Sequence, residues 1–546
     1  MLSIDQPSIT GANRTVISDA KSCQNWIAAL PLTNAPAAQT ELQLQLELLN
    51  HSSALSGHER WLILEQLRES ILSVQDMVAQ KYLGKPIPME AGEKSLWKKT
   101  LDLWQDVTQG YQICLQNFQD NDQALAGVAP SILQRILRLI GTQMACYQQT
   151  YQSVPDALWK QLNQTYALAE NLRLNKATLK DPLSQNPDDI THPESAYLQV
   201  LLMDMADPYH LQPKQFQVIS QWLERWSTRV RLSTTPVAIA HPELNLPALV
   251  VDLNRPTGIQ FGTPFESGAN LRHLDMNLLA ATLIKRIRHL RKGGAPEELD
   301  IGAECQQPVC EAMLIRLYQQ WCEAPQHRAF ERRPGESKAQ VSFTIASIHF
   351  FCNGGKPFRQ PSERPQEEFS WREAQDLKIF GQVSTQTKKM QASQVGFNAE
   401  NWEIMDESAL GFRLAATGLH AARISLNQLI AIRHPQAKHF AIGMIRWMRF
   451  DSEGDLNVGI RTFPGIPMAV GIRAPVLISN LQNKFLQAFL LPEIPALKEQ
   501  ATLVLPHGWF APNKQLQLHI DDTLNVRLTK SLERGSDFER VGFEIK

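Results

Sequence analysis

The strongest constraint on the fold is a change in hydrophobic period near residue 330. Before it, apolar residues recur at steps of three and four, as at Trp61, Leu64 and Leu67. After it, stretches such as AQVSFTIASIHFF (339–351) alternate polar and apolar residues. The first period is typical of amphipathic helices and the second of β-strands. The sequence therefore predicts a multidomain α+β chain, in which an all-α helical domain precedes antiparallel β-structure.

A chain of 546 residues is too long for one ordinary hydrophobic core, so we expect several domains. Breaks in periodicity and turn-forming residues set their expected bounds. The expected segments are a flexible N-terminal segment (1–40), a helical domain (41–325) with a β-hairpin insertion near 234–256, an antiparallel β-barrel (326–470) with a polar insertion near 353–375, and a small β-module (471–546).

Charge and apolar runs narrow the class of protein. The 54 basic and 55 acidic residues nearly cancel, so no overall field favours nucleic acid or an anionic membrane as a partner. The first residues, MLSIDQPSIT, lack the basic and apolar regions of a signal peptide, and no apolar run is long enough to span a bilayer. Seven scattered cysteines are typical of reduced, buried thiols. These features predict a cytoplasmic protein without a membrane span.

Two polar clusters stand out beside the first predicted strands. HRAFERRPGE places Arg328, Arg332 and Arg333 on one short segment, and DESALG places Asp406 and Ser408 ahead of Gly411. Guanidinium groups bind phosphate oxygens with forked donors and stack on purine rings. A carboxylate accepts hydrogen bonds from a base edge, a hydroxyl donates or accepts, and a glycine permits a backbone conformation or a close approach. Together these residue types predict a nucleotide-binding site.

The same residues resemble a known family. Arg328-x-x-x-Arg332 and Asp406-x-Ser408-x-x-Gly411 resemble the RxxxR and [D/N]xSxxG motifs of PilZ domains, and residues 424–463 resemble the later PilZ strands. The resemblance implies a six-stranded barrel that binds the bacterial second messenger cyclic di-GMP. In that family the arginines hold phosphates and stack on guanine, and the second motif contacts the guanine edge. The helical part is similar to the N-terminal extensions of some large PilZ proteins.

We therefore expect a non-catalytic cyclic di-GMP receptor, with no cofactor or metal, that signals to a protein partner through the helical domain. The sequence contains no HExxH, GxSxG or GxGxxG motif. One alternative is a helical adaptor or scaffold whose PilZ-like barrel is degenerate and binds nothing. A weaker alternative is a nucleic-acid binder that uses the basic helix at 275–292, although its cations are also typical of a solvated helix face. The spacings of Cys305, Cys310, Cys322 and His327 match no familiar zinc site, and the cysteines are predicted to lie in the core.

Overall fold

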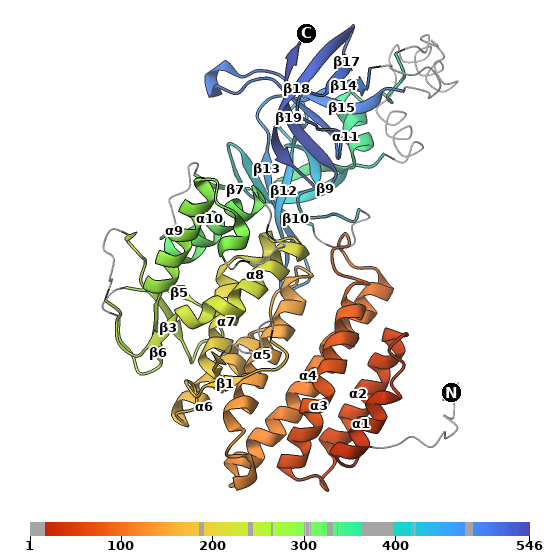
Figure 1. The fold of residues 1–546 in the computed structure, drawn as a ribbon. Coiled ribbons are helices and arrows are strands. Elements are labelled where there is room, and N and C mark those ends of the chain that lie inside the picture. Colours follow the sequence, from red (N-terminus) through yellow and green to blue (C-terminus); the bar gives the residue numbers. More distant parts are fainter. Residues whose placement is uncertain are drawn as a thin grey trace, which may run out of the picture. The chain divides into compact units, whose positions relative to one another are not determined.

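The computed structural model describes most of the chain: residues 17–184, 190–238, 244–263, 266–299, 301, 305, 307–324, 331–335, 337–361, 397–416, 418, 422–475 and 484–546. The chain divides into two compact units (Figure 1). Unit 1 contains residues 1–85 and 89–326, and unit 2 contains residues 86–88 and 327–546. In the ranges just given, no helix combines the length and apolar character needed to cross a membrane.

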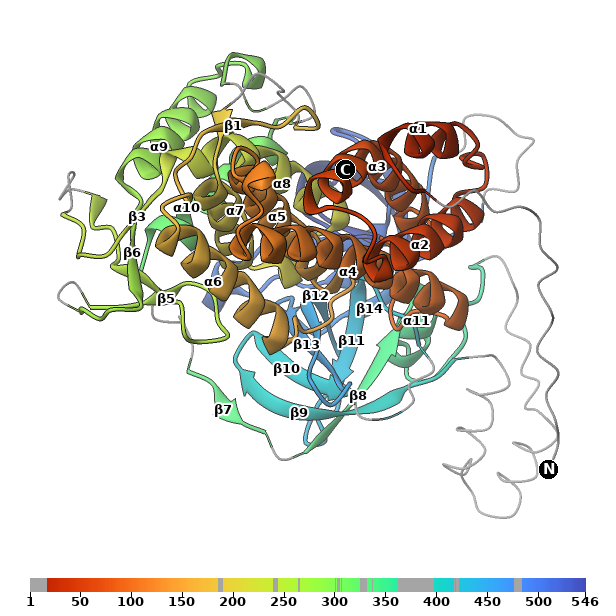
Figure 2. The same cartoon turned by 90° about the horizontal axis from the view of Figure 1, so that it is seen from below.

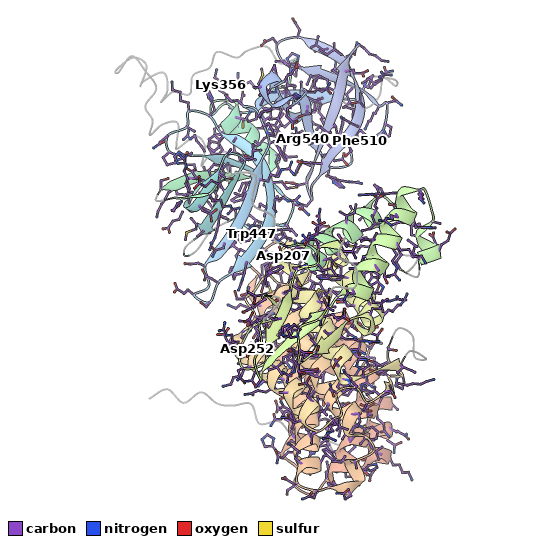
Figure 3. All side chains as sticks on the ribbon, turned by 90° about the vertical axis from the view of Figure 1, so that its left-hand side faces the viewer. Asp207, Asp252, Lys356, Trp447, Phe510 and Arg540 are labelled. Atoms are coloured by element: carbon purple, nitrogen blue, oxygen red, sulfur yellow. A yellow bond between two sulfur atoms is a disulfide. The ribbon has the colours of Figure 1, made fainter. Side chains whose placement is uncertain are left out.

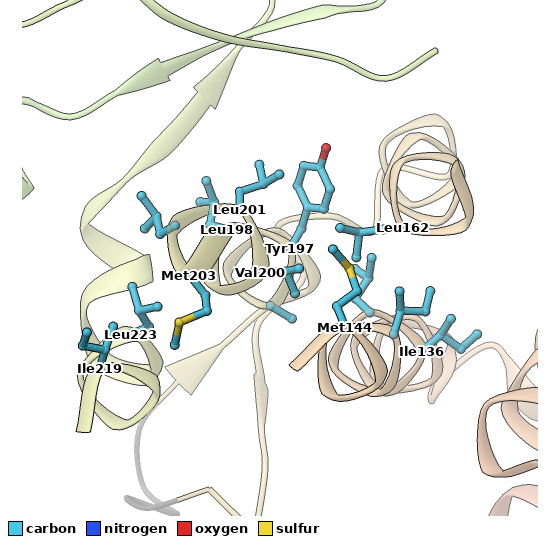
Figure 4. Packing of buried hydrophobic residues seen from close by; sticks show 14 of the residues in the cluster. Ile136, Met144, Leu162, Tyr197, Leu198, Val200, Leu201, Met203, Ile219 and Leu223 are labelled. Atoms are coloured by element: carbon cyan, nitrogen blue, oxygen red, sulfur yellow. The ribbon is translucent and has the colours of Figure 1, made fainter. Parts of the chain in front are cut away.

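Unit 1 is built from amphipathic helices that bury their apolar faces against one another. They are α1 (Ala20–Ala28), α2 (Ala35–His51), α3 (Gly57–Ala79), α4 (Ala91–Gln119), α5 (Ala129–Gln148), α6 (Asp156–Asn171), α7 (Pro193–Met205), α8 (Pro213–Trp226), α9 (Asn277–Arg291) and α10 (Val309–Cys322). The close-up in Figure 4 shows how α7 is enclosed, with Tyr197 and Val200 on the side of Met144 from α5, and Met203 on the side of Leu223 from α8. The helical class predicted for this region is confirmed.

The N-terminal segment expected to be flexible contains a helix. Asp19 caps α1 by accepting a hydrogen bond from the Ser22 backbone N–H at 2.7 Å, and the Ser22 hydroxyl group accepts one from the Asp19 N–H at 3.0 Å. Cys23 is fully buried and joins the core that α3 contributes to. The reciprocal cap and one buried apolar stripe are enough to hold a helix of nine residues in place.

The region expected to carry a hairpin near 234–256 contributes one strand to a larger sheet. Strand β4 (Leu249–Asp252) pairs with β5 (Gln260–Phe261) and with β6 (Leu271–Asp275), and β6 also pairs with β3 (Arg231–Ser233). The described residues from Thr234 to Ala238 are not a strand. Pairing partners that lie well beyond residue 256 in sequence explain why local pattern alone suggested a hairpin.

Unit 1 also buries a charge network. The Asp181 carboxylate is fully buried and accepts from Arg68 at 2.8 Å, Arg135 at 3.0 Å and Arg138 at 3.1 Å. Glu65 holds Arg135 from the other side at 3.1 Å. Removing one partner from such a network would leave a buried charge uncompensated, so the network favours this particular helix arrangement.

The barrel in unit 2 closes on itself. Its strands are β8 (Lys338–Phe343), β9 (Glu400–Ser408), β10 (Gly411–Ala416), β11 (Leu429–Arg433), β12 (Ala441–Phe450) and β13 (Leu456–Thr462). They pair in the ring order β8, β9, β10, β13, β12, β11, and β11 returns to β8. Short strand β7 (Arg333–Pro334) pairs with the last residues of β9, on the same edge of β9 that β8 occupies nearer its start (Figure 2).

One expected strand of this barrel is shorter than predicted, and most of the expected polar insertion lies outside the described residues. The stretch 339–351 is a strand only as far as Phe343, because Thr344 caps helix α11 (Ile345–Cys352) by accepting from the Ser347 N–H. Alternation of apolar residues over so short a segment does not distinguish a buried helix from a strand. Of the polar insertion expected near 353–375, residues 362–375 lie outside the described residues.

The C-terminal module is a second closed barrel, and it shares a core with the first. Its strands are β14 (Met468–Arg473), β15 (Leu486–Leu491), β16 (Thr502–Pro506), β17 (Gln515–His519), β18 (Thr523–Arg534) and β19 (Phe538–Ile545). Phe489 and Phe538 pack with Leu429 and Met444 from the outer face of the first barrel. Arg540, labelled in Figure 3, lies with its guanidinium carbon 5.3 Å from the centre of the Phe463 ring. The predicted fold class, helices followed by a barrel and a second β-module, is confirmed.

Candidate nucleotide-binding site

Strand β7 brings the two predicted motifs together. Pro334 lies opposite Asp406 in the β7–β9 register, and the Gly335 N–H donates to the Met405 carbonyl at 3.2 Å. A Cβ atom at Gly335 would lie 2.4 Å from the Ile404 Cγ2 atom, so only glycine allows this approach. As a result, the Arg332 guanidinium group forms an ion pair with the Asp406 carboxylate. Arg332 is 28% exposed and Asp406 21%, so both remain partly open to solvent.

A β-bulge determines which way the acid points. Leu414 of β10 lies opposite Ile404, and the next residue, Arg413, lies opposite Asp406, so Met405 is the extra residue of β9. Ile404 and Leu414 are buried in the barrel interior, and Asp406 and Arg413 therefore face outward. Without this extra residue, the alternation of the strand would direct Asp406 into the apolar interior.

Ser408 and Gly411 lie directly opposite each other at the β9–β10 turn. The Ser408 hydroxyl group donates to the Gly411 carbonyl at 3.4 Å. The φ angle of Gly411 is not in the left-handed region, so the conformational freedom of glycine is not what this position uses. A Cβ atom there would lie 3.1 Å from the Ile460 carbonyl oxygen and 3.5 Å from the serine oxygen. Gly411 therefore leaves space on the outer surface beside Ser408 that a side chain would fill.

Sequence reasoning missed two residues that share this surface. Arg413 lies opposite Asp406 on one side and Gly459 on the other, and its Nη2 donates to the Asn457 Oδ1 atom at 3.0 Å. Trp447 lies opposite Gly459, and its indole covers that glycine so closely that a Cβ atom would be 1.8 Å from Nε1. The sequence carried one signal for this arrangement, because a glycine within a strand marks close approach of another group.

The remaining predicted residues are distributed as follows. Arg333 is exposed and lies opposite Glu407. Glu407 is 3.8 Å from the His434 ring nitrogen. Arg328 lies outside the described residues. The structure thus brings Arg332, Asp406, Ser408 and Gly411 to one outward face of the barrel. A guanidinium group able to bind phosphate lies there beside a carboxylate and a hydroxyl group, which can form hydrogen bonds with a base edge.

The basic helix of the nucleic-acid alternative is α9, and its cations do not form one solvated face. Arg286 is buried, with its guanidinium carbon 4.7 Å from the centre of the Trp226 ring, and Arg291 pairs with Glu311 at 3.1 Å. Together with apolar side chains, the other basic residues of α9 and its C-cap line a groove of about 490 Å³: Lys285, Arg288, His289 and Lys292.

One pair of cysteines differs from the expectation of reduced thiols, and the other five are free thiols. Cys305 and Cys310 form a disulfide, with their Cα atoms 5.2 Å apart, a separation that a disulfide requires. Cys322 is a buried thiol, and burial raises its pKa to about 12. Within the described ranges no three His, Cys, Asp or Glu side chains gather to hold a metal ion, and His327 lies outside those ranges.

Comparison with known proteins identifies the family of the chain. Three domain models match in order along the chain: the N-terminal domain of the cyclic-di-GMP receptor FimW at residues 21–237, its middle PilZ domain at 266–401, and its C-terminal β-barrel domain at 472–545. This chain is a PilZ-domain protein. The resemblance carried by the two motifs is confirmed at the level of the family. The middle-domain match ends before Asp406, whereas the PilZ barrel continues to Thr462.

Two individual proteins are similar to this PilZ protein. The cyclic-di-GMP receptor FimW of Pseudomonas aeruginosa is 21% identical over 562 residues, covering 95% of this chain and 89% of FimW. A solved structure of MrkH, described as a c-di-GMP-dependent transcription regulatory factor, aligns with 39% of this chain and 88% of its own at 6% identity. Its TM-score of 0.12 is too low to support any inference about fold or function.

Proposed function

We propose that this chain is a non-catalytic cytoplasmic receptor for cyclic di-GMP. The observation that carries the proposal is the meeting of Arg332 with Asp406 beside Ser408 and Gly411, on one outward face of a PilZ barrel. The name of the relative with similarity along nearly the whole chain, a cyclic-di-GMP receptor, supports the same ligand. Arg332 and Arg328 would hold phosphates, Arg333 would add positive potential, and Asp406 with Ser408 would accept from the guanine edge.

Binding would exchange one ion pair for two contacts. Arg332 would move from the Asp406 carboxylate to a phosphate, and the carboxylate would turn to the N1–H and N2 amino group of guanine. The pair is partly exposed, and such pairs contribute only about 0–1 kcal/mol to stability, so it presents a small barrier to this exchange.

The test is calorimetric titration of the full chain with cyclic di-GMP, with linear pGpG and GMP as controls. We expect saturable binding of the cyclic dinucleotide and much weaker binding of both controls. A chain with an intact melting transition that shows no heat and no melting shift with cyclic di-GMP would favour the scaffold alternative.

The receptor would pass its signal to a protein partner through the helical unit. A groove of about 780 Å³ between α4, α5 and α6 supports this assignment. It is lined by apolar side chains (Trp97, Leu101, Tyr147 and Leu158) and by several glutamines, and aromatic residues such as Trp and Tyr are enriched in protein interfaces. The same groove would serve the adaptor alternative, in which the barrel binds no ligand. The nucleic-acid alternative predicts instead a salt-dependent shift of a DNA or RNA probe that is lost when Lys285 and Lys292 become Gln.

A further inference from the structure

A row of residues crosses three strands on the outer face of the PilZ barrel. Ser408 of β9 lies opposite Gly411 of β10, and Gly411 lies opposite Arg461 of β13. Directly opposed residues in an antiparallel sheet point to the same face, so Arg461 shares the surface of the candidate site. Neighbouring strands are about 4.8 Å apart, so only the glycine gap separates the hydroxyl group from the base of the arginine side chain.

Arg461 is held by the second barrel. Its Nη2 atom is 3.2 Å from the Glu533 Oε1 atom, on β18. Arg461 is 55% exposed, whereas Glu533 is 13% exposed, and the other carboxylate oxygen, Oε2, is buried without a hydrogen-bond partner among the described residues. A largely buried carboxylate with one unpartnered oxygen favours a cation beside it, so Glu533 holds Arg461 when no phosphate is bound.

A second guanidinium group, that of Arg446, lies within electrostatic range of that carboxylate. Arg446 is the extra residue of a bulge in β12, between Ile445 and Trp447. Partial desolvation and the neighbouring Arg461 lower the pKa of Arg446, and Glu533 opposes this shift, so the three groups lie within electrostatic reach of one another. Two cations around one acid leave an excess of positive charge at the edge of the site, which favours an additional anion.

We propose that Arg461 is a further phosphate-binding residue of the nucleotide site and that Glu533 holds it in place of a phosphate. The inference rests on the proposed function and extends it. A phosphodiester presents two oxygens in the geometry that a guanidinium fork binds best, so the ligand competes directly with the glutamate. The exchange releases Glu533, which lies in a part of β18 whose register with β19 is irregular, between Leu528 and Glu533. The second barrel thereby becomes part of the receptor.

The experiment compares three variants of the full chain in cyclic di-GMP titrations: Arg461→Gln, Glu533→Gln and Arg527→Gln. Arg527 is the matched control, because it is also an arginine paired with a glutamate, Glu544 at 2.5 Å, and it lies in β18. We expect Arg461→Gln to weaken binding by about tenfold or more. Glu533→Gln removes the competing charge, and we expect it to tighten binding severalfold. Arg527→Gln should bind within about twofold of the wild type, as expected for an exposed pair.

The opposite signs of the first two effects separate the proposal from a purely structural ion pair. A structural pair predicts that both variants lower the melting temperature alike and that neither tightens binding. Equal affinities for the wild type and Arg461→Gln, or weaker binding by Glu533→Gln, would overturn the inference. If Arg461→Gln does not fold, Arg461→Lys keeps the charge and loses the fork, and we then expect intermediate affinity. Loss of binding in Arg332→Ala with normal binding in Arg461→Gln would leave the proposed function intact, whereas no binding by the wild type would refute both.

Discussion

Arg332 has two possible partners, Asp406 and a phosphate, and one substitution separates them. Arg332→Ala removes a partly exposed ion pair, so we expect the free energy of unfolding to fall by only about 0–1 kcal/mol. The same change removes charge-assisted hydrogen bonds to the ligand, and we expect binding to lose about 2–5 kcal/mol. A thermal melt without nucleotide and a titration with it measure the two quantities. A large fall in melting temperature with unchanged affinity would mean that the pair is structural.

Asp406 predicts a preference between second messengers. Guanine donates from N1–H and its N2 amino group, whereas adenine presents an acceptor at N1. The carboxylate facing that acceptor would be left unpaired, at a cost of about 1–3 kcal/mol. We therefore expect cyclic di-AMP to bind about 5- to 150-fold more weakly than cyclic di-GMP in calorimetry. Equal affinities would refute the assignment of Asp406 to the base edge.

For single residues, the sequence predicts which residue types form the site better than it predicts which residues lie next to them in space. Asp406, Ser408 and Gly411 follow from residue types and a motif, and the structure brings them beside Arg332. Arg461 could not be predicted, because its place beside Gly411 depends on the register of strands that lie 50 residues apart in sequence.

Helix α4 carries a prediction about pH. Burial and the carboxylates of Glu47 and Asp102 raise the pKa of Asp106 to about 6, and His51 opposes the shift. An unfolded aspartate ionises near pH 4, so the folded state binds the extra proton between about pH 4 and 6. The stability that this proton confers is present below pH 4 and is lost as pH rises through 6.

The variant Asp106→Asn cannot ionise and avoids that loss. We expect its melting temperature to match the wild type near pH 4 and to exceed it by about 1–3 °C at pH 7. Asp102→Asn is the control, since removing one neighbouring charge should give part of the gain. A constant difference between Asp106→Asn and the wild type across this pH range would contradict the raised pKa.

Helices and strands were predicted correctly where the spacing of apolar residues was regular over a long continuous segment. The spacing of apolar residues identified the helices of unit 1, and it missed α1, whose short pattern is completed by the reciprocal cap between Asp19 and Ser22. Alternation overextended the strand that ends at Phe343, because Thr344 starts a helix there. Closure of the second barrel depends on pairing of β14 with β17 and of β16 with β19, which no local pattern encodes.

For the whole molecule, the core shared by the two barrels predicts cooperative unfolding. Phe538 is fully buried at this junction, with its ring 5.6 Å from that of Phe463. We expect Phe538→Ala to destabilise unit 2 by about 3–5 kcal/mol and to lower the unfolding transition of both barrels together. Hydrogen exchange measured along each barrel would detect this. Faster exchange confined to β14–β19, with the PilZ strands unchanged, would show that the barrels unfold independently.

The chain leaves unit 1 after Lys85, gives three residues to unit 2 and returns at Met89. The Ile87 and Ile424 backbones exchange two hydrogen bonds of 2.8 Å, and Ile87 is buried. A gene fragment that starts at residue 327 would therefore encode every strand of both barrels and still omit part of the folded unit. We expect such a fragment to be less stable than one with residues 86–88 fused to it, so the piece of DNA that two genes could exchange as one folding unit is larger than the barrels alone.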